Sequence, residues 1–332
     1  YVLTIAFTDG TNNLGAQSTD VTVTDVNDQT PTYTATSTTP TVTEGATAVD
    51  TNVAITDTDT GDDNTCTKGG ADAALFTCTV SATAYSVAFS SAPDYDSGTA
   101  CAGGNSCTVT IKINDGAQDG ATITYTITVA DANDQTPAAT VASSYSVAEN
   151  TATVASIAVT DTDTTGTLDC SVAGTDGSLF ECSVSSGTAT LAFSSAPNYE
   201  SASDAGANNV YDVTVSFTDG TNTLGAQTTA ITVTDLNDQT PVYQAADADD
   251  AISVAENSGT GTIDAGTISS VDSVDTLGCT LGGADAADFA CSVTGTTVNV
   301  AFAADPDYDN PADADTNNVY VVTVLVDDGT DN

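Results

Sequence analysis

The sequence has almost no positive charge. Lys and Arg together number 2 and His is absent, against 46 Asp and Glu, for a net charge of -44 at pH 7. Such a chain lacks the basic face that an electrostatic nucleic-acid binder needs, and anionic lipid should repel it. It also repels itself unless cations lie among its carboxylates. Two explanations stay open: specific divalent-metal sites, or a generally acidic, salt-adapted surface.

Other absences narrow the function further. Without His and with so few Lys or Arg, the chain has few candidates for a general base or an activated nucleophile, so we expect no enzyme. No run approaches the ~20 apolar residues of a membrane span, so this segment should not insert into a membrane. Neither a Met nor a signal peptide is visible. We therefore expect a mature or excised piece of a longer protein.

The cysteines form an even set with a repeated spacing. Three pairs lie twelve residues apart at the same point of a repeat, and a fourth pair is local. This pattern favours disulfides in an oxidising, extracellular compartment, whereas zinc, the alternative, prefers CxxC clusters. A loop of about a dozen residues closed in this way is stabilised by on the order of 3 kcal/mol. The predicted disulfides are Cys66–Cys78, Cys101–Cys107, Cys170–Cys182 and Cys279–Cys291.

A seven-residue phrase, DxNDQTP, occurs three times, at 25–31, 131–137 and 235–241. Its period is the size of a small domain. Between the copies, alternation as in YVLTIAFTDG (1–10) and YDVTVSFTDG (211–220) indicates half-buried strands. The middle repeat contains seven such short strands in about 95 residues. We predict an all-β chain of tandem seven-stranded Greek-key sandwiches of the immunoglobulin-like type.

The predicted domains cover residues 32–130, 138–234 and 242–332, and the DxNDQTP phrases join them. Residues 1–24 carry only the last two strands of a preceding or partner domain, and the third domain lacks its last strand, because 1–13 resembles 320–332. Either the chain is a window of a longer array, which the overlap favours, or one copy donates a strand to the next. Copies of itself or further repeats, head to tail, are the expected partners, and such contacts generate an open fibre.

Five short motifs recur in one order: DxNDxxP, an EN motif (VAEN at 147–150 and 254–257), DTD (57–59, 161–163), PDYD or PNYE (93–96, 197–200, 306–309) and TDG (8–10, 218–220). In this order they resemble the calcium motifs of cadherin repeats, and the resemblance covers essentially the whole chain. It implies a cadherin-like, microbial-type surface array with several Ca²⁺ at each domain junction. Calcium takes about 6–8 oxygen ligands, more than one loop here offers, so the linker and both neighbouring domains would contribute.

Carried over residue by residue, the resemblance implies the following metal ligands. The first complete junction would use Glu44, Asp94, Asp96, Asp131, Asn133, Asp134, Asp161, Asp163 and Asp219. The second would use Glu149, Asn198, Glu200, Asp235, Asn237, Asp238 and Asp328, with Asp272 or Asp275 in place of its missing DTD motif. The N-terminal junction keeps Asp25, Asn27, Asp28, Asp57, Asp59 and Asp115, and the far end keeps Glu256, Asp307 and Asp309.

The acids outside these sets are expected to be solvated surface, with 313–318 (DADTNN) as an alternative extra calcium loop. The function expected from the sequence is that of an extracellular, calcium-rigidified structural protein. It would form a stiff fibre or stalk for surface attachment or cell–cell linkage, with a head-to-tail filament as one form. The alternatives are an adhesin ectodomain that binds a protein or glycan partner, and an acidic calcium-storing matrix protein. The damaged DTD motif predicts that the second junction is the most flexible.

Overall fold

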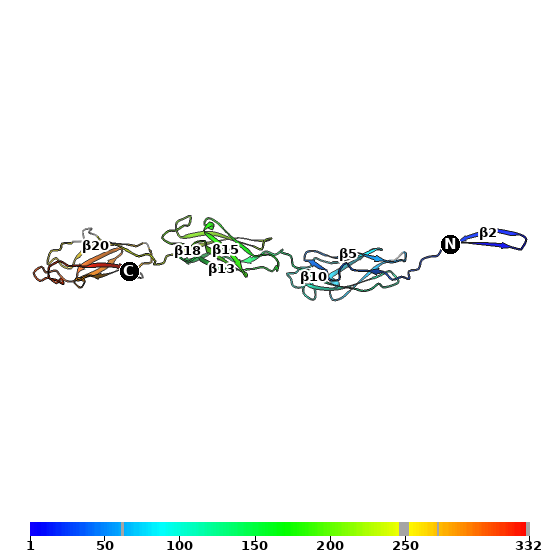
Figure 1. The fold of residues 1–332 in the computed structure, drawn as a ribbon, viewed down its shortest axis with the longest axis horizontal. Coiled ribbons are helices and arrows are strands. Elements are labelled where there is room, and N and C mark those ends of the chain that lie inside the picture. Colours follow the sequence, from blue (N-terminus) through cyan, green and yellow to red (C-terminus); the bar gives the residue numbers. More distant parts are fainter. Residues whose placement is uncertain (61–62, 246–251, 271, 330–332) are drawn as a thin grey trace. The chain divides into compact units, whose positions relative to one another are not determined.

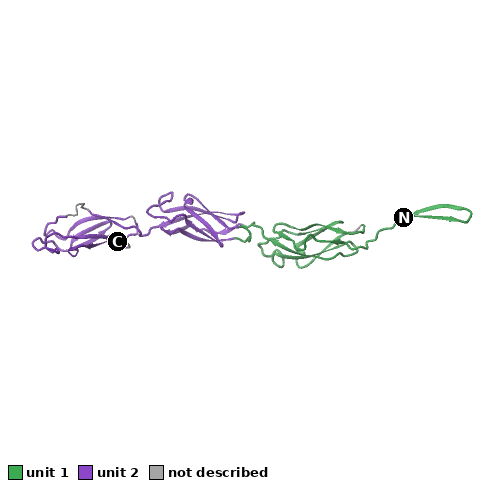
Figure 2. Ribbon diagram, viewed as in Figure 1, with its two compact units in different colours: residues 1–135, 161–166 green, residues 136–160, 167–332 purple. Residues whose placement is uncertain are grey.

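Antiparallel strands dominate the computed structural model, which describes residues 1–332 except 61–62, 246–251, 271 and 330–332 (Figure 1). The described residues form two compact units, one of residues 1–135 with 161–166 and one of residues 136–160 with 167–332 (Figure 2). The regular structure assigned in them consists of strands and three single-turn 3-10 helices. The predicted all-β sandwich architecture is confirmed, whereas the division into three domains with the stated boundaries stays a prediction.

The first unit contains a hairpin and one sandwich. The hairpin pairs β1 (Val2–Thr8) with β2 (Asn13–Asp20). One sheet of the sandwich has the order β4-β10-β9-β6, with β4 (Thr41–Thr43), β10 (Ile123–Ala130), β9 (Ser106–Asn114) and β6 (Thr65–Gly69). The other has the order β3-β5-β8-β7, with β3 (Thr32–Tyr33), β5 (Ala48–Thr56), β8 (Ala84–Phe89) and β7 (Phe76–Val80), which η1 (Ala73–Leu75) precedes.

The second unit contains two pairs of sheets, of which the first has the same order as the sandwich of the first unit and the second has one sheet of only two assigned strands. Its first pair of sheets has the orders β12-β18-β17-β14 and β11-β13-β16-β15. The bounds are β11 (Ala138–Ala139), β12 (Ser144–Ala148), β13 (Thr153–Thr160), β14 (Asp169–Ala173), η2 (Gly177–Leu179), β15 (Phe180–Ser185), β16 (Thr188–Phe193), β17 (Val210–Thr218) and β18 (Thr223–Thr234). The next pair has the orders β19-β20-β23-β22 and β21-β24. Its elements are β19 (Val242–Gln244), β20 (Thr262–Ser269), β21 (Gly278–Gly282), η3 (Ala286–Asp288), β22 (Phe289–Thr294), β23 (Thr297–Phe302) and β24 (Thr323–Asp327).

All four predicted disulfides are confirmed. Cys66 lies in β6 and Cys78 in β7, so this bond joins the two sheets of the first sandwich, with Cα atoms 6.2 Å apart. Cys170–Cys182 joins β14 to β15, and Cys279–Cys291 joins β21 to β22, in the same way. The three repeat-equivalent disulfides are therefore staples across the sandwich.

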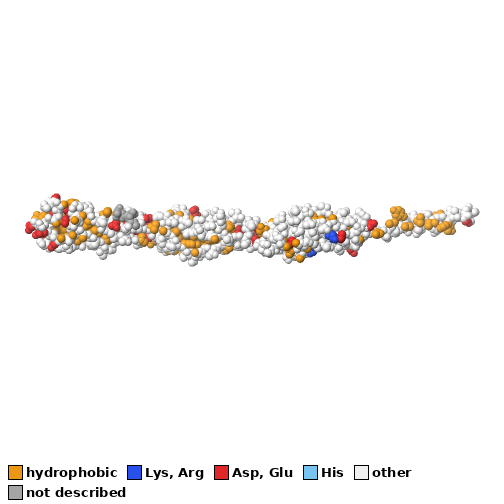
Figure 3. Space-filling model, turned by 90° about the horizontal axis from the view of Figure 1, so that it is seen from below, with side chains coloured by type: hydrophobic (Ala, Val, Ile, Leu, Met, Phe, Trp, Pro, Cys, Tyr) orange, Lys and Arg blue, Asp and Glu red, His pale blue; other side chains and the backbone are white. Residues whose placement is uncertain are grey.

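The strands of the hairpin are exposed, whereas the alternation in their sequence predicted half-buried strands. Its register, including the irregularity between Ile5 and Phe7, repeats that of β17 and β18 between Val215 and Phe217. Phe217 is fully buried, yet Phe7 is 62% exposed, because no second sheet covers the hairpin among the described residues. Figure 3 shows the resulting hydrophobic side chains along this segment.

Several acids outside the ligand sets are buried, so the expectation that they are solvated surface is wrong for them. Asp72 accepts the backbone N–H of Ala102 (2.7 Å) and of Thr108 (2.7 Å), one on each oxygen. The repeat-equivalent Asp176 and Asp285 bind two backbone N–H groups in the same way. Each carboxylate satisfies donors from two segments far along the chain, which offsets its burial. The buried acids outside the ligand sets are Asp50, Asp72, Asp176, Asp204, Asp285 and Asp313.

The loop before β9, β17 or β24 is closed by different chemistry in different repeats. In the second unit, Asp204 accepts the backbone N–H groups of Asn208 and Asn209. Asp313 does the same for its own loop, 313–318, which gives this segment a structural account without a metal. In the first unit the disulfide of Cys101 closes the equivalent loop.

The first sandwich contains a buried polar network. The Tyr125 hydroxyl donates to Asp50 Oδ2 at 3.0 Å and lies 3.0 Å from the Tyr85 hydroxyl, while the Thr36 N–H donates to the same Asp50 oxygen. Burial, and then hydrogen bonding to Tyr85, raise the pKa of Tyr125 above its ordinary value. The middle sandwich has the smaller Ala189 and Thr229 at the positions of the two tyrosines.

We expect Tyr125→Phe to destabilise the first sandwich by about 1–3 kcal/mol, because Asp50 loses a donor while it stays buried. The readout is native-state hydrogen exchange of amides in β9 and β10. Tyr308→Phe, at a residue 67% exposed, is the control and should change nothing. Since the folded-state pKa is raised, the tyrosine's contribution is present below pH about 10 and lost above it, and the variant should lose less stability there. Equal exchange in the two variants would contradict this role.

Candidate metal centres

A buried glutamate ties each of the linkers 131–137 and 235–241 to the sandwich that precedes it. Glu44 follows β4 and accepts the N–H of Tyr95 (2.7 Å) on one oxygen and of Ala132 (2.8 Å) on the other. Glu149 follows β12, is fully buried, and binds the Tyr199 and Leu236 N–H groups at 2.8 Å each. Glu256 makes the first of these contacts, to Tyr308. The EN motif and its VTEG variant therefore fix the linker against the PDYD or PNYE loop.

Two reciprocal contacts tie the linker to the loop after the next long strand. The first linker acid accepts the N–H and hydroxyl of a Thr or Ser, as Asp25 does from Thr60 at 2.7 and 2.8 Å. In return Asp59 accepts the N–H groups of Asp28 (2.7 Å) and Gln29 (2.6 Å). The equivalent contacts recur as Asp131–Thr164, Asp163–Gln135, Asp235–Ser273, Asp272–Asp238 and Asp272–Gln239.

These contacts leave oxygens that are buried but have no hydrogen-bond partner. Asn27, for example, donates its amide to the Asp115 carbonyl at 3.0 Å, and its own Oδ1 has none. Asp115 accepts the Ala117 and Gln118 N–H groups on Oδ1, which leaves Oδ2. Such oxygens among the predicted ligands are Asn27 Oδ1, Asp57 Oδ2, Asp96 Oδ1 and Oδ2, Asp115 Oδ2, Asp131 Oδ1, Asp161 Oδ2, Glu200 Oε1 and Oε2, Asp235 Oδ1, Asn237 Oδ1, Asp272 Oδ1 and Asp275 Oδ1.

Carboxylates also gather in space. In the first unit Glu44, Asp96 and Asp134 form one group and Asp96, Asp131 and Asp163 a second, each with ligand oxygens within 4.8 Å of one another. In the second unit the groups are Glu149, Glu200 and Asp235, and Glu200, Asp238 and Asp272. Asp96 and Glu200 each belong to two groups, an arrangement that suits carboxylates bridging neighbouring cations. A purely oxygen donor set fits a hard cation such as Ca²⁺.

Burial and the closeness of these carboxylates raise the pKa values of Asp96 and Glu200, the two residues that each belong to two groups. Burial raises the pKa of Asp96 to about 6, with further contributions from the charges of Asp163, Glu44 and Asp131. Burial likewise raises the pKa of Glu200 to about 7, helped by Glu149 and Asp235. A nearby cation would act in the opposite direction, because it favours the charged form.

Most of the remaining predicted ligands make hydrogen bonds to nearby backbone groups, many of them within their own loops. Asp94, Asn198 and Asp307 accept N–H groups within their own turns. Asp219 accepts those of Thr221 and Asn222, while Asn133 lies in its linker. Asp309 donates its backbone N–H to Asp307. The backbone carbonyl of Asp328 accepts the side-chain amide of Asn237. The ligand assignments stay predictions, because proximity and burial do not identify a bound ion.

Two kinds of side-chain hydrogen bond at the linkers were not predicted from the sequence. Gln29, Gln135 and Gln239 each donate the side-chain amide to the preceding linker aspartate at 2.7–2.8 Å. Asn150 donates to Asp238 at 2.6 Å. The invariance of Gln across the three DxNDQTP phrases was the available signal for the first of these roles.

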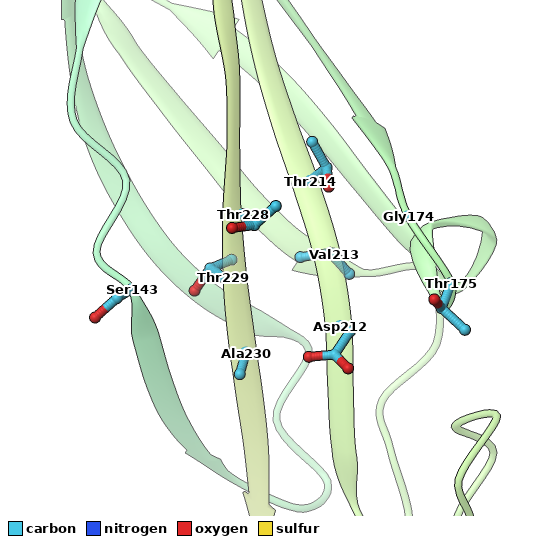
Figure 4. Close-up of a pocket in the computed structure, with 9 residues that line it drawn as sticks. All are labelled: Ser143, Gly174, Thr175, Asp212, Val213, Thr214, Thr228, Thr229 and Ala230. Carbon is cyan, nitrogen blue, oxygen red and sulfur yellow. The ribbon is translucent and has the colours of Figure 1, made fainter.

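A separate hollow lies on the middle sandwich, over β17 and β18 (Figure 4). Its volume is about 450 Å³, and it is open to solvent. Hydroxyl groups and one carboxylate dominate its lining, which comprises Ser143, Gly174, Thr175, Asp212, Val213, Thr214, Thr228, Thr229 and Ala230.

No family model and no curated protein matches the chain. Solved structures do match. Protocadherin gamma B7 extracellular cadherin domains 1-4 has a TM-score of 0.54 and 18% identity, with 91% of this chain and 73% of that chain covered. PcdhgB3 EC1-4 has a TM-score of 0.62 and 17% identity, with 98% and 78% covered.

Mouse cadherin-23 EC22-24 is similar with a TM-score of 0.50 and 21% identity, over 91% of this chain and 94% of that chain. This chain spans 62% of the protocadherin gamma B2 structure of domains 1-5. The chain therefore has the fold of tandem cadherin domains, and the resemblance seen in its motifs is confirmed at the level of fold. Among the described residues no helix is long and apolar enough to cross a membrane.

Cation binding at these clusters should release protons at about pH 6 and few at about pH 8.5, because the raised pKa values leave Asp96 and Glu200 partly protonated at the lower pH. Titration calorimetry with Ca²⁺ in buffers of different ionisation enthalpy measures the release. In the cation-free chain the same shifts favour folding at low pH, and this contribution is lost as pH rises through about 6 and 7. Proton release that persisted in Asp96→Asn/Glu200→Gln would argue against these two groups.

Proposed function

We propose that this chain is an extracellular structural protein whose cadherin-like sandwiches are made rigid at their linkers by Ca²⁺. The observation that carries the proposal is the set of buried, unpartnered oxygens on residues such as Asp96, Glu200 and Asn237, all beside a DxNDQTP linker. Leaving a buried acceptor unsatisfied costs about 1–3 kcal/mol, and more for a charged group. So many unpartnered oxygens beside each linker are best explained by a bound ligand that carries positive charge.

The protein's part in this mechanism is to hold the linker in one conformation. Glu44 or Glu149 fixes its start, and Asp59, Asp163 or Asp272 fixes its end, each through backbone N–H groups. Bound Ca²⁺ supplies the charge that offsets repulsion between carboxylates, which reaches about 4 kcal/mol per pair at 4 Å for an effective dielectric of 20. Without it, the same contacts must hold a cluster of like charges together.

The wider proposal is a stiff fibre or stalk for surface attachment or cell–cell linkage, with copies or further repeats of the chain joined head to tail. The four disulfides support an oxidising, extracellular location. One similar structure, that of protocadherin gammaB7 EC3-6, is a cis-dimer, which makes self-association a reasonable partner hypothesis here.

A second candidate, an adhesin that binds a glycan, is favoured by the hollow on the middle sandwich. Thr214, Thr228 and Asp212 offer hydroxyl and carboxylate groups to sugar hydroxyls, and about 450 Å³ lies within the usual size of a ligand site. The lining contains no aromatic side chain on which a sugar ring could stack. The structural role therefore stays the main proposal.

We expect EGTA to loosen the linkers while each disulfide-stapled sandwich stays folded. Small-angle scattering measures the first effect, and hydrogen exchange of core strands the second. Asp96→Asn should weaken calcium binding and reproduce the loosening in part, without losing a hydrogen bond within the protein, because both Asp96 oxygens are unpartnered.

Asp72→Asn is the matched control. Both of its oxygens accept backbone N–H groups, so it should destabilise the sandwich by about 1–3 kcal/mol with or without calcium. Identical scattering with and without EGTA would refute calcium stiffening.

For the second candidate, Thr214→Val/Asp212→Asn should reduce binding at least about tenfold for any ligand found on an array of neutral oligosaccharides, because it removes hydrogen bonds worth about 1.5–3 kcal/mol. The equivalent change in the first sandwich, at Thr110→Val, is the control. Binding that tolerated the double variant would exclude the hollow as the site.

A further inference from the structure

The loop after β20 lacks one aspartate that its two counterparts, the loops after β5 and β13, contain. In the first copy of this loop Thr60 donates to the linker Asp25, and Asp59 accepts from Gln29. In the second unit Ser273 donates to Asp235, and Asp272 accepts from Gln239. These shared contacts make Asp272 the counterpart of Asp59 and Asp163. Counting back two residues, Ser270 stands where the other copies have Asp57 and Asp161.

The carboxylate missing from Ser270 is replaced in space from further along the chain. The Ser270 hydroxyl donates to Asp275 Oδ2. A serine Oγ occupies the place that Cγ has in an aspartate, so the acceptor oxygen of Asp275 lies near where the lost carboxylate oxygen would be. The other oxygen, Asp275 Oδ1, is buried and has no hydrogen-bond partner, as is Asp57 Oδ2 in the first unit.

Other side chains of this junction keep the arrangement seen at the first linker. Asn237 donates its amide to the Asp328 carbonyl at 2.9 Å and leaves Oδ1 buried and unpartnered, as Asn27 does with Asp115. Asp272 is 7% exposed, its Oδ1 has no partner, and it belongs to the group with Glu200 and Asp238. An almost fully buried carboxylate that has one oxygen without a partner points to a cation independently of the acids' mere number.

We propose that Asp275, oriented by the Ser270 hydroxyl, is the substitute ligand that lets the 235–241 junction keep a full set of divalent cations. The inference rests on the proposed calcium function and refines it. It also changes the expectation drawn from the damaged DTD motif, since the junction would retain its cations through a carboxylate supplied from another backbone position.

The test is the number of Ca²⁺ ions bound by the whole chain, measured by equilibrium dialysis and native mass spectrometry. Asp275→Asn should lower the number by one at moderate Ca²⁺. Ser270→Ala removes only the orienting hydroxyl and should weaken that one ion by about ten- to a hundredfold, as loss of a second-shell partner does. Ser270→Asp/Asp275→Asn restores the ordinary DTD-type acid and should recover the ion.

Asp288→Asn, in η3 of the same sandwich, removes the same charge and should leave the number unchanged. Hydrogen exchange in EGTA should show that all variants fold alike. If Asp275→Asn and Asp288→Asn bind equally many ions, the inference is overturned while the calcium function stands. If the unaltered chain binds no Ca²⁺, the proposed function fails first.

Discussion

The interaction on which this structure depends is the hydrogen bond between a buried carboxylate and backbone N–H groups from a distant segment. Glu44, Glu149, Asp59 and Asp272 each use it to fix the course of a linker. Charge-assisted bonds of this kind are about twice as strong as neutral ones. They orient each acid but do not neutralise it, so repulsion between neighbours persists until a cation is present.

The same bond separates two kinds of acid. Asp72, Asp176 and Asp285 have donors on both oxygens, and their role inside the sandwich is complete. The linker acids typically have donors on one oxygen only, and Asp96 and Glu200 have no hydrogen-bond partner on either. Counting satisfied oxygens therefore separates Asp72, Asp176 and Asp285 from Asp96 and Glu200, whereas the linker glutamates Glu44 and Glu149 combine donors on both oxygens with a place in a carboxylate group.

Local patterns predicted the strands and the staples because alternation and spacing are properties of short segments. The order of motifs likewise predicted which acids gather, as in the group of Glu44, Asp96 and Asp134. The burial of Asp72 was not predictable, because its donors at Ala102 and Thr108 lie in another loop and strand. Asp275 stayed undecided for the same reason: its role depends on the direction of its side chain, which composition does not reveal. The exposed face of the hairpin depends on tertiary covering rather than on its own alternation.

Differences between the repeats show where the sequence is constrained. The loop closed by Asp204 in one sandwich is closed by Cys101–Cys107 in another, and the Tyr85–Tyr125–Asp50 network gives way to Ala189 and Thr229. The linker contacts are instead reproduced at each DxNDQTP phrase, and where one acid is lost, Ser270 and Asp275 hold a carboxylate near its place. The oxygen arrangement at the linker is therefore constrained, and within each sandwich the inter-sheet disulfide and the buried acid equivalent to Asp72 recur while other interior positions vary.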